Sequence, residues 1–131
     1  MSNRISASAN AVQHKTAGPY SPVLRISAGD IVVISGQAPV NLDGKVIGET
    51  IEEQALLTLE NCKAQLLTGG ATLADVFKVN VYLTDLAEWP RFNAVYSQFM
   101  PRPFPARTAI GCALLDGFKV EIEMWAAPGA E

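Results

Sequence analysis

Charged residues of opposite sign lie among apolar neighbours in the last quarter of the sequence. Arg107 belongs to the stretch FPARTAIG, and Glu121 and Glu123 alternate with apolar residues in VEIEMWA. A guanidinium can hold a carboxylate through two parallel hydrogen bonds, and a glutamate can move a proton or activate water. The same residue types could instead form a surface ion pair of little energetic value. The residue types leave both interpretations open.

The alternation of side chains along Arg107's segment suggests where the guanidinium points. Successive residues of a strand face opposite sides of a sheet, so Arg107, Ala109 and Gly111 share one side. The other side is bulkier and consists of Thr108, Ile110, Cys112 and Leu114. We expect the bulky set to face the helices. Arg107 is therefore predicted on the open face, beside small residues that leave room for a ligand.

The final strand predicts a similar division between a core face and an open face. Glu121, Glu123 and Trp125 alternate with a set expected in the core, Val120, Ile122, Met124 and Ala126. Asp116-Gly117 has the chemistry of a hairpin turn, which would make the last two strands neighbours. We therefore expect Arg107 and the two glutamates on one surface.

The elements that precede these strands follow from periodicity and turn residues. The runs PVLRIS and IVVISGQAPV, separated by residues 28–30, predict a β-hairpin over residues 23–40. Thr50, followed three residues later by Glu53, predicts a capped helix that ends near Leu67. The apolar stripe of this helix is Ile51, Ala55, Leu59, Cys62 and Leu66.

A half-buried strand is predicted next at FKVNVYLTDL, where Val79, Val81 and Leu83 alternate with more polar residues. A second helix is predicted at EWPRFNAVYSQF, where Pro90 suits the first helical turn. The prolines of MPRPFP should end this helix, before the two closing strands. The order is therefore ββαβαββ in a single domain, residues 1–131. This indicates an α+β fold, a mixed sheet with both helices on one face. The other face must meet solvent or another subunit.

Composition narrows the class of protein. The chain has 131 residues, 49% hydrophobic and 18% charged, which favours one ordered core and a surface partly covered by partner subunits. A net charge of -3 without a basic cluster disfavours nucleic-acid binding. The apolar runs are too short to span a membrane, and MSNRISASAN lacks the apolar centre of a signal peptide. We expect a cytoplasmic protein.

The residues that commonly bind metals are scarce and scattered. Cys62 and Cys112 lie far apart in apolar segments, without a CxxC pair, and are interpreted as buried free thiols. His14 is the single histidine and has no carboxylate or cysteine close by in the sequence. We therefore expect neither a metal site nor a Ser-His-Asp triad.

Five further residues stand out as polar groups or glycine in apolar settings: Tyr20 in GPYSPV, Ser35, Gly36 and Gln37 in ISGQAPV, and Asn93 in FNAVY. Each has a structural explanation, as a turn aromatic, a strand bulge at Gly36 or a surface amide. Taken singly, none of them indicates a site.

Taken together, these segments resemble the RidA/YjgF family of reactive-intermediate deaminases, also known as L-PSP endoribonucleases. The resemblance extends nearly from end to end and lies in GPYSPV, ISGQAPV, IEEQALLTLENCKAQL, DVFKVNVYLTDL, FNAVYSQF, FPARTAI and VEIEMWA. It implies a chorismate-mutase-like fold and a homotrimer. In that trimer the open sheet faces would form a barrel-like interior, with a ligand cleft at each subunit interface.

The resemblance also implies roles for particular residues. Arg107 of the FPAR motif would bind the carboxylate of a 2-imino or 2-enamino acid, such as 2-aminoacrylate. Glu121, the first glutamate of EIE, would activate water for attack on the imine carbon. The implied lining of the cleft is Tyr20, Ser35, Gly36, Asn93 and Ala109. The implied products are a 2-oxo acid and ammonia, formed without a metal or an organic cofactor.

The sequence departs from the family pattern at three positions near these motifs. Ala109 stands where many members have cysteine, Gly111 where a larger polar residue is frequent, and Trp125 where an aliphatic residue is usual. These differences bear on the size of the substrate. Two other functions remain open from the sequence: a non-catalytic module that binds a small carboxylate, and a ribonuclease, which an acidic chain with one histidine supports poorly.

Overall fold

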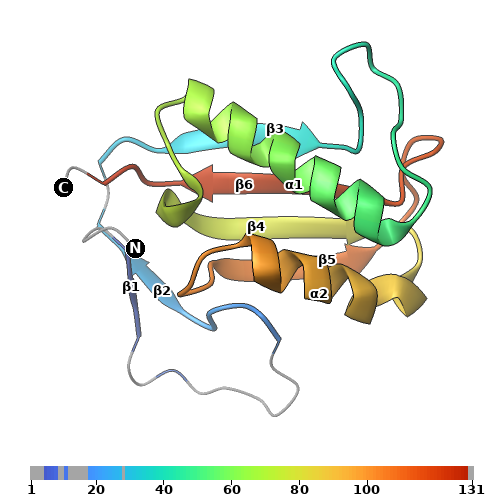
Figure 1. Cartoon of the computed structure of the whole chain (residues 1–131). Helices are drawn as coiled ribbons and strands as arrows, with labels where there is room; N and C mark the ends of the chain where they lie inside the picture. The colour runs from blue at the N-terminus through green and yellow to red at the C-terminus, as the bar shows by residue number, and fades with distance from the viewer. Residues whose placement is uncertain (1–4, 9–10, 12–17, 28, 130–131) are drawn as a thin grey trace.

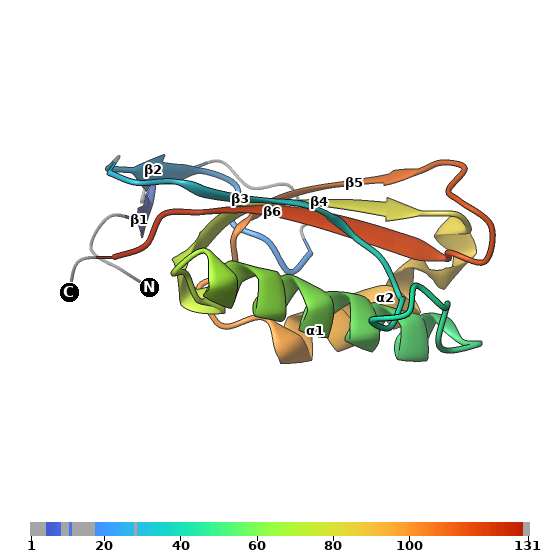
Figure 2. The same cartoon turned by 90° about the horizontal axis from the view of Figure 1, so that it is seen from above.

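Two α-helices cover one face of a four-stranded mixed sheet in the computed structural model, which describes residues 5–8, 11, 18–27 and 29–129 (Figures 1 and 2). The strands of the sheet are β3 (Val32–Gln37), β4 (Val76–Leu83), β5 (Ala106–Gly111) and β6 (Val120–Ala126). The helices are α1 (Ile51–Thr68) and α2 (Trp89–Phe99); the 3-10 turn η1 (Leu73–Asp75) follows α1 and leads into β4, and the 3-10 turn η2 (Leu86–Glu88) follows β4 and leads into α2. A separate ribbon pairs β1 (Ile5–Ala7) with β2 (Leu24–Ile26). The predicted α+β class with both helices on one face is confirmed.

The strand order in the sheet is β3-β6-β4-β5. Strands β4 and β5 are parallel and are connected through α2, whereas β6 runs antiparallel to both of its neighbours, β3 and β4. The last strand of the chain therefore lies in the middle of the sheet. Its inward side chains, Val120, Ile122, Met124 and Ala126, are fully buried beneath the helices, as expected.

Both predicted hairpins are wrong. Strand β2 pairs with β1 instead of β3, and β4 separates β5 from β6. The turn chemistry itself was correctly identified, because Gly117 has a φ of 87°. A turn reverses the chain, however, but does not determine which strand will pair with the strand that follows it. A strand as apolar as β6 is most favourably placed at the centre of the sheet. The short, serine-containing β1 was not expected at all.

Helix α1 forms as its sequence predicts. The Thr50 side chain accepts a hydrogen bond from the Glu53 backbone N–H at 3.1 Å, and the Glu53 carboxylate accepts one from the Thr50 N–H at 3.1 Å. The predicted apolar stripe is fully buried: Ile51, Ala55, Leu59, Cys62 and Leu66. The helix ends at Thr68, and Gly70 follows with a φ of 84°, in the left-handed region that favours glycine.

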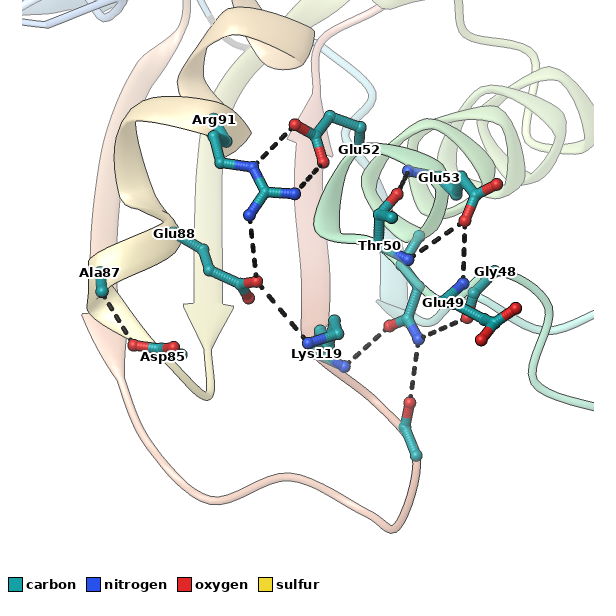
Figure 3. A network of polar contacts seen from close by, with 12 residues as sticks. Gly48, Glu49, Thr50, Glu52, Glu53, Asp85, Ala87, Glu88, Arg91 and Lys119 are labelled. Carbon is teal, nitrogen blue, oxygen red and sulfur yellow. Dashed lines mark hydrogen bonds and ion pairs between the residues drawn. The ribbon is translucent and has the colours of Figure 1, made fainter.

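A network of ion pairs connects three parts of the fold (Figure 3). These are the first turn of α1, the continuous segment of η2 and the first turn of α2, and the start of β6. The Arg91 guanidinium donates to both carboxylate oxygens of Glu52, at 2.8 and 2.6 Å. The Glu88 carboxylate lies 3.6 Å from Arg91 and 3.6 Å from Lys119. These side chains are solvent-exposed to different degrees, so the network orients the element ends more than it stabilises them.

The buried side chain of Gln54 forms hydrogen bonds next to this network. Its amide group donates to the carbonyls of Gly48 at 3.0 Å and Gly117 at 3.1 Å, and its oxygen accepts from the Lys119 N–H at 2.8 Å. The side chain is 3% exposed, so its polar atoms need these partners. Gln54 thereby attaches α1 to the loop that leads into β6.

The expected state of the cysteines holds for one thiol fully and for the other in part. Both are free; Cys62 is buried, and burial raises the pKa of its thiol to about 12, whereas Cys112 is only half-buried. His14 lies outside the described residues. Among the helices that the structure describes, none is long and apolar enough to cross a membrane.

Candidate functional site

Arg107 lies on the helix-covered face of the sheet, which corrects the predicted open-face position. The parallel register pairs Arg107 with Val79 and Ala109 with Val81, and these two valines are fully buried beneath the helices. Residues paired across neighbouring strands share a face. Conversely, Thr108 and Ile110 are exposed on the other face.

The small residues of β5 face the helices because there is little room for larger ones. A Cβ atom added at Gly111 would lie 2.9 Å from Cγ of Leu86, closer than real Cβ contacts. Ala109 faces the same layer, beside Leu86 and Trp89. The expectation that the bulkier side chains of this strand face the core is wrong, because β5 is an edge strand that η2 and α2 approach closely.

The Arg107 guanidinium lies within a group of aromatic and amide side chains. Its Nη1 donates a hydrogen bond of 2.9 Å to Oδ1 of Asn93. Its Cζ lies 4.8 Å from the ring centroid of Trp89 and 4.7 Å from that of Tyr96, with the Tyr20 ring at 5.8 Å. Cation–π contacts of this kind stabilise and orient a guanidinium.

Helix α2 supplies three of these contacts from one of its faces. Trp89, Asn93 and Tyr96 follow one another at four- and three-residue spacing, so their side chains lie one above the other. Phe92 is fully buried and stacks on Trp89, with ring centroids 5.6 Å apart. The sequence analysis identified Asn93 but missed Trp89 and Tyr96 as partners of Arg107. Their spacing around Asn93 was the available signal.

Tyr20 reaches the guanidinium from a segment far away in the sequence. The Ser21 backbone N–H donates to the Pro105 carbonyl at 3.0 Å, which holds the segment beside the start of β5. Gly18 lies close as well, because a Cβ there would be 3.4 Å from Nη2 of Arg107. Tyr20, Asn93, Arg107 and Ala109 thus form one group, called here the arginine group.

No carboxylate forms an ion pair with Arg107 among the residues that the structure describes. The guanidinium is nevertheless half-buried, and desolvation lowers the pKa of Arg107 from its ordinary value. Arginine stays protonated all the same. A partly desolvated cation of this kind can bind an anion, and a planar carboxylate fits its fork best.

The other predicted residues form a second group on the open face. Strand β3 has a bulge between Ile34 and Gln37, as predicted at Gly36. A Cβ on Gly36 would lie 2.2 Å from Oε2 of Glu121, so the carboxylate rests directly on the glycine. Ser35 is exposed beside it. Ser35, Gly36 and Glu121 are called here the glutamate group.

The open face also carries a polar contact next to Glu121. The Tyr82 hydroxyl donates to the Glu123 carboxylate at 2.8 Å, and this hydrogen bond raises the pKa of Tyr82. Tyr82 pairs with Glu121 across β4 and β6, so Glu121 is flanked by the phenol and by Gly36. Glu123 is thereby occupied, whereas Glu121 has no ion-pair partner among the described residues.

The arginine group and the glutamate group therefore lie on opposite faces of one sheet, and the predicted shared surface is wrong. Paired residues prove the division: Val79, opposite Arg107, is buried under the helices, and Tyr82, opposite Glu121, is on the open face. Within the described part of the chain, no three His, Cys, Asp or Glu side chains gather as metal ligands. The described residues therefore offer an arginine suited to an anion on the helix-covered face and a carboxylate on the open face.

The fold and these two groups define a small α+β protein with a partly buried arginine suited to an anion, and known proteins share this architecture. The crystal structure of RidA from an Antarctic Psychrobacter species superimposes with a TM-score of 0.71 at 37% identity, covering 78% of this chain and 84% of that one. A family model described as Endoribonuclease L-PSP matches residues 10–128. The chain belongs to this family, the RidA/YjgF family, and the resemblance seen in the sequence is confirmed.

Two relatives indicate the range of proteins that this chain is similar to. Protein mmf2, mitochondrial, from Schizosaccharomyces pombe is 37% identical over 122 residues, covering 90% of this chain and 94% of its own. A 2-iminobutanoate/2-iminopropanoate deaminase from Dermatophagoides farinae is 35% identical over 108 residues, covering 81% and 83%.

Proposed function

We propose that this protein hydrolyses 2-imino and 2-enamino acids, such as 2-aminoacrylate, to 2-oxo acids and ammonia. The observation that carries the proposal is the half-buried Arg107 guanidinium, oriented by Asn93 and two aromatic rings and without a carboxylate partner among the described residues. Such a group is suited to the carboxylate that all of these substrates share. The name of the mite relative supports the same reaction class.

The proposed reaction needs one anion site and one proton carrier. Arg107 holds the substrate carboxylate, and an enamine first becomes the imine by moving a proton to carbon. Glu121 accepts a proton from water while the water oxygen bonds to the imine carbon and the nitrogen takes up a proton from the solvent. The resulting carbinolamine expels ammonia when Glu121 gives its proton to the amino group, and the hydroxyl proton passes to the solvent as the C=O bond forms. Hydrolysis of an imine by this route requires neither a metal nor an organic cofactor.

The proposal requires a second copy of the chain, because Arg107 and Glu121 lie on opposite faces of one sheet. A small substrate on Arg107 is out of reach of Glu121 from the same chain. We assign the assembly as a homotrimer in which the arginine group of one subunit meets the glutamate group of the next at each interface. Exposed apolar residues on the open face, Val33 at 58% and Ile110 at 46%, support its burial in such an assembly.

The test is the rate at which the protein removes an imine formed in the assay. A dehydratase releases 2-aminoacrylate from serine, and semicarbazide traps what remains; the wild-type protein should suppress the trapped product. Arg107→Ala should lower kcat/KM by at least about 100-fold by removing the carboxylate anchor. Arg91→Ala is the matched control, since Arg91 lies on α2, pairs with Glu52 and is outside the arginine group.

Two outcomes would redirect the proposal. Binding of 2-oxo acids that depends on Arg107, without acceleration of any imine hydrolysis, would indicate a binding module. Cleavage of RNA that persists in Arg107→Ala would indicate the ribonuclease in the family's name. The compartment belongs to the proposal too: we assign the cytoplasm, although the name of one relative places that protein in mitochondria.

A further inference from the structure

An apolar pocket lies next to the arginine group and has no part in the reaction described above. Its walls are Leu86, Trp89 and Ala109. Trp89 contacts both the pocket and the arginine group, because its ring centroid lies 4.8 Å from Cζ of Arg107. Ala109 follows Arg107 by two residues on the same face of β5. The pocket therefore begins where the bound carboxylate would end.

The pocket exists because β5 carries very small side chains at this point. Ala109 contributes a single methyl group to the wall. Gly111 allows Leu86 to approach, since a Cβ at Gly111 would lie 2.9 Å from Cγ of Leu86. Leu86 is 57% exposed, although leucine is usually buried, and it forms the outer wall. No charged side chain lines this space among the described residues.

The position of the pocket suits the side chain of an amino-acid-derived imine. In a 2-imino acid the side chain begins two bonds from the carboxylate carbon. Alternate residues of a strand are about 6.5–7 Å apart. Because Trp89 adjoins both the guanidinium and the pocket, we expect a carboxylate on Arg107 to direct a side chain of three or more carbons past the Trp89 ring towards Ala109, whereas the one-carbon group of 2-aminoacrylate would leave the pocket empty.

We infer that the Leu86–Trp89–Ala109 pocket selects apolar side chains of about three to five heavy atoms, so that imines derived from leucine- or methionine-like amino acids are preferred to 2-aminoacrylate. The inference rests on the proposed function in that Arg107 holds the carboxylate. The enzymes that supply such substrates would oxidise the amino group of large apolar amino acids to an imine.

Binding of stable product analogues tests the pocket without relying on catalysis. Titration calorimetry compares 4-methyl-2-oxopentanoate with pyruvate, which lacks three of its carbons. Each methylene removed from water is worth up to about fourfold in affinity, so partial burial of three carbons should give about tenfold tighter binding. Arg107→Lys should weaken both ligands.

Substitutions in the pocket should remove the preference. Ala109→Leu fills the pocket and should reduce the affinity ratio of the two acids to about twofold or less. Leu86→Ser makes the exposed wall polar and should lower the same ratio without disturbing the core. Thr108→Val is the matched control on the opposite face of β5, where Thr108 accepts a hydrogen bond from Lys78 at 2.8 Å. It should retain the wild-type ratio.

The corresponding kinetics separate the two ideas. An L-amino-acid oxidase supplies the imines of leucine and alanine, and the ratio of their kcat/KM values should follow the affinity ratio. Equal affinities in the wild type, or equal losses for both acids in Ala109→Leu, would overturn the pocket assignment even if imines are hydrolysed. A tenfold affinity ratio without hydrolysis of either imine would overturn the proposed reaction and leave the pocket assignment standing.

Discussion

Arg107 and Glu121 lie on opposite faces of the same sheet, on strands that β4 separates. Arg107 pairs in register with Val79, which is buried under the helices, and Glu121 pairs with Tyr82 on the open face. Both side chains nevertheless have chemistry that suits one reaction. The arrangement is explained if each interface between copies of the chain combines an arginine from one copy with a glutamate from the next.

Mixed assemblies of two inactive variants should therefore recover activity. Arg107→Ala and Glu121→Gln each remove one half of every site, so their pure forms should be inactive. After co-refolding at equal amounts, about a quarter of the interfaces should combine an intact arginine with an intact glutamate in a cyclic assembly. The measurement is imine hydrolysis relative to the wild type. Recovery that stays at zero, with mixed assembly verified by mass spectrometry, would contradict a shared site.

Gly36→Ala should disable Glu121 without touching it. The new methyl group would occupy the place of the Glu121 carboxylate, whose Oε2 lies 2.2 Å from the position of that Cβ. The glutamate must turn away, and kcat should fall by about 10- to 100-fold while the KM changes little. The control is the double variant Gly36→Ala/Glu121→Gln, which should be no slower than Glu121→Gln alone. Additive losses would show that Gly36 acts on something else.

Asn93→Asp should block the anion site from within. Asn93 accepts a hydrogen bond from Arg107 at 2.9 Å, and an aspartate there would supply a permanent carboxylate for the guanidinium. The internal carboxylate competes with the substrate, so kcat/KM should fall by about 10- to 100-fold, given charge-assisted bonds worth about 1.5–3 kcal/mol. Asn93→Ala, which removes the acceptor without adding charge, should lose less. An Asp variant as active as the wild type would exclude Arg107 as the carboxylate anchor.

Tyr96→Phe should leave the protein as stable as before or more stable. The Tyr96 ring is fully buried against Phe92 and Phe104, and its hydroxyl finds no hydrogen-bond partner among the described residues. Burial also raises the pKa of this phenol. Removing an unsatisfied buried hydroxyl should raise the free energy of unfolding by up to about 1 kcal/mol. Urea denaturation measures it, and a loss above 1 kcal/mol would contradict the unsatisfied state of the hydroxyl.

The Glu52–Arg91 pair should stabilise the folded protein near neutral pH but not near pH 2. The hydrogen bonds from Arg91 lower the pKa of Glu52 from its ordinary value of 4.5 to about 2. A depressed carboxyl pKa favours the folded state above pH 4.5, and this contribution disappears as the pH falls towards 2. Glu52→Gln should therefore lower the unfolding free energy at pH 7 and match the wild type near pH 2. Glu60→Gln, exposed on the same helix, should show no such convergence.

Local signals in the sequence were sufficient for the helices and for the inward faces of two strands. The Thr50–Glu53 capping pair and the three- and four-residue spacing of apolar residues determine where α1 begins and which side it buries. Alternation likewise predicted the buried sides of β4 and β6. These features depend on residues within a few positions of one another, so the sequence displays them directly.

The orientation of β5 required the tertiary structure. Its alternation was read correctly, but bulk was taken to mark the core side, whereas Ala109 and Gly111 are small because Leu86 and Trp89 lie against that side. Strand order was likewise not predictable from the turn at Gly117, because a turn does not specify which strand is paired after it.

The sequence by itself determined the family, the helices and the identity of the candidate residues, because each of these is written in short motifs. Only the tertiary structure decided that Arg107 lies under α2, held by Asn93 between Trp89 and Tyr96, while Glu121 rests on Gly36 at the opposite face. Strand register and strand order are set by long-range pairing, and a one-residue change of register moves every side chain to the other face.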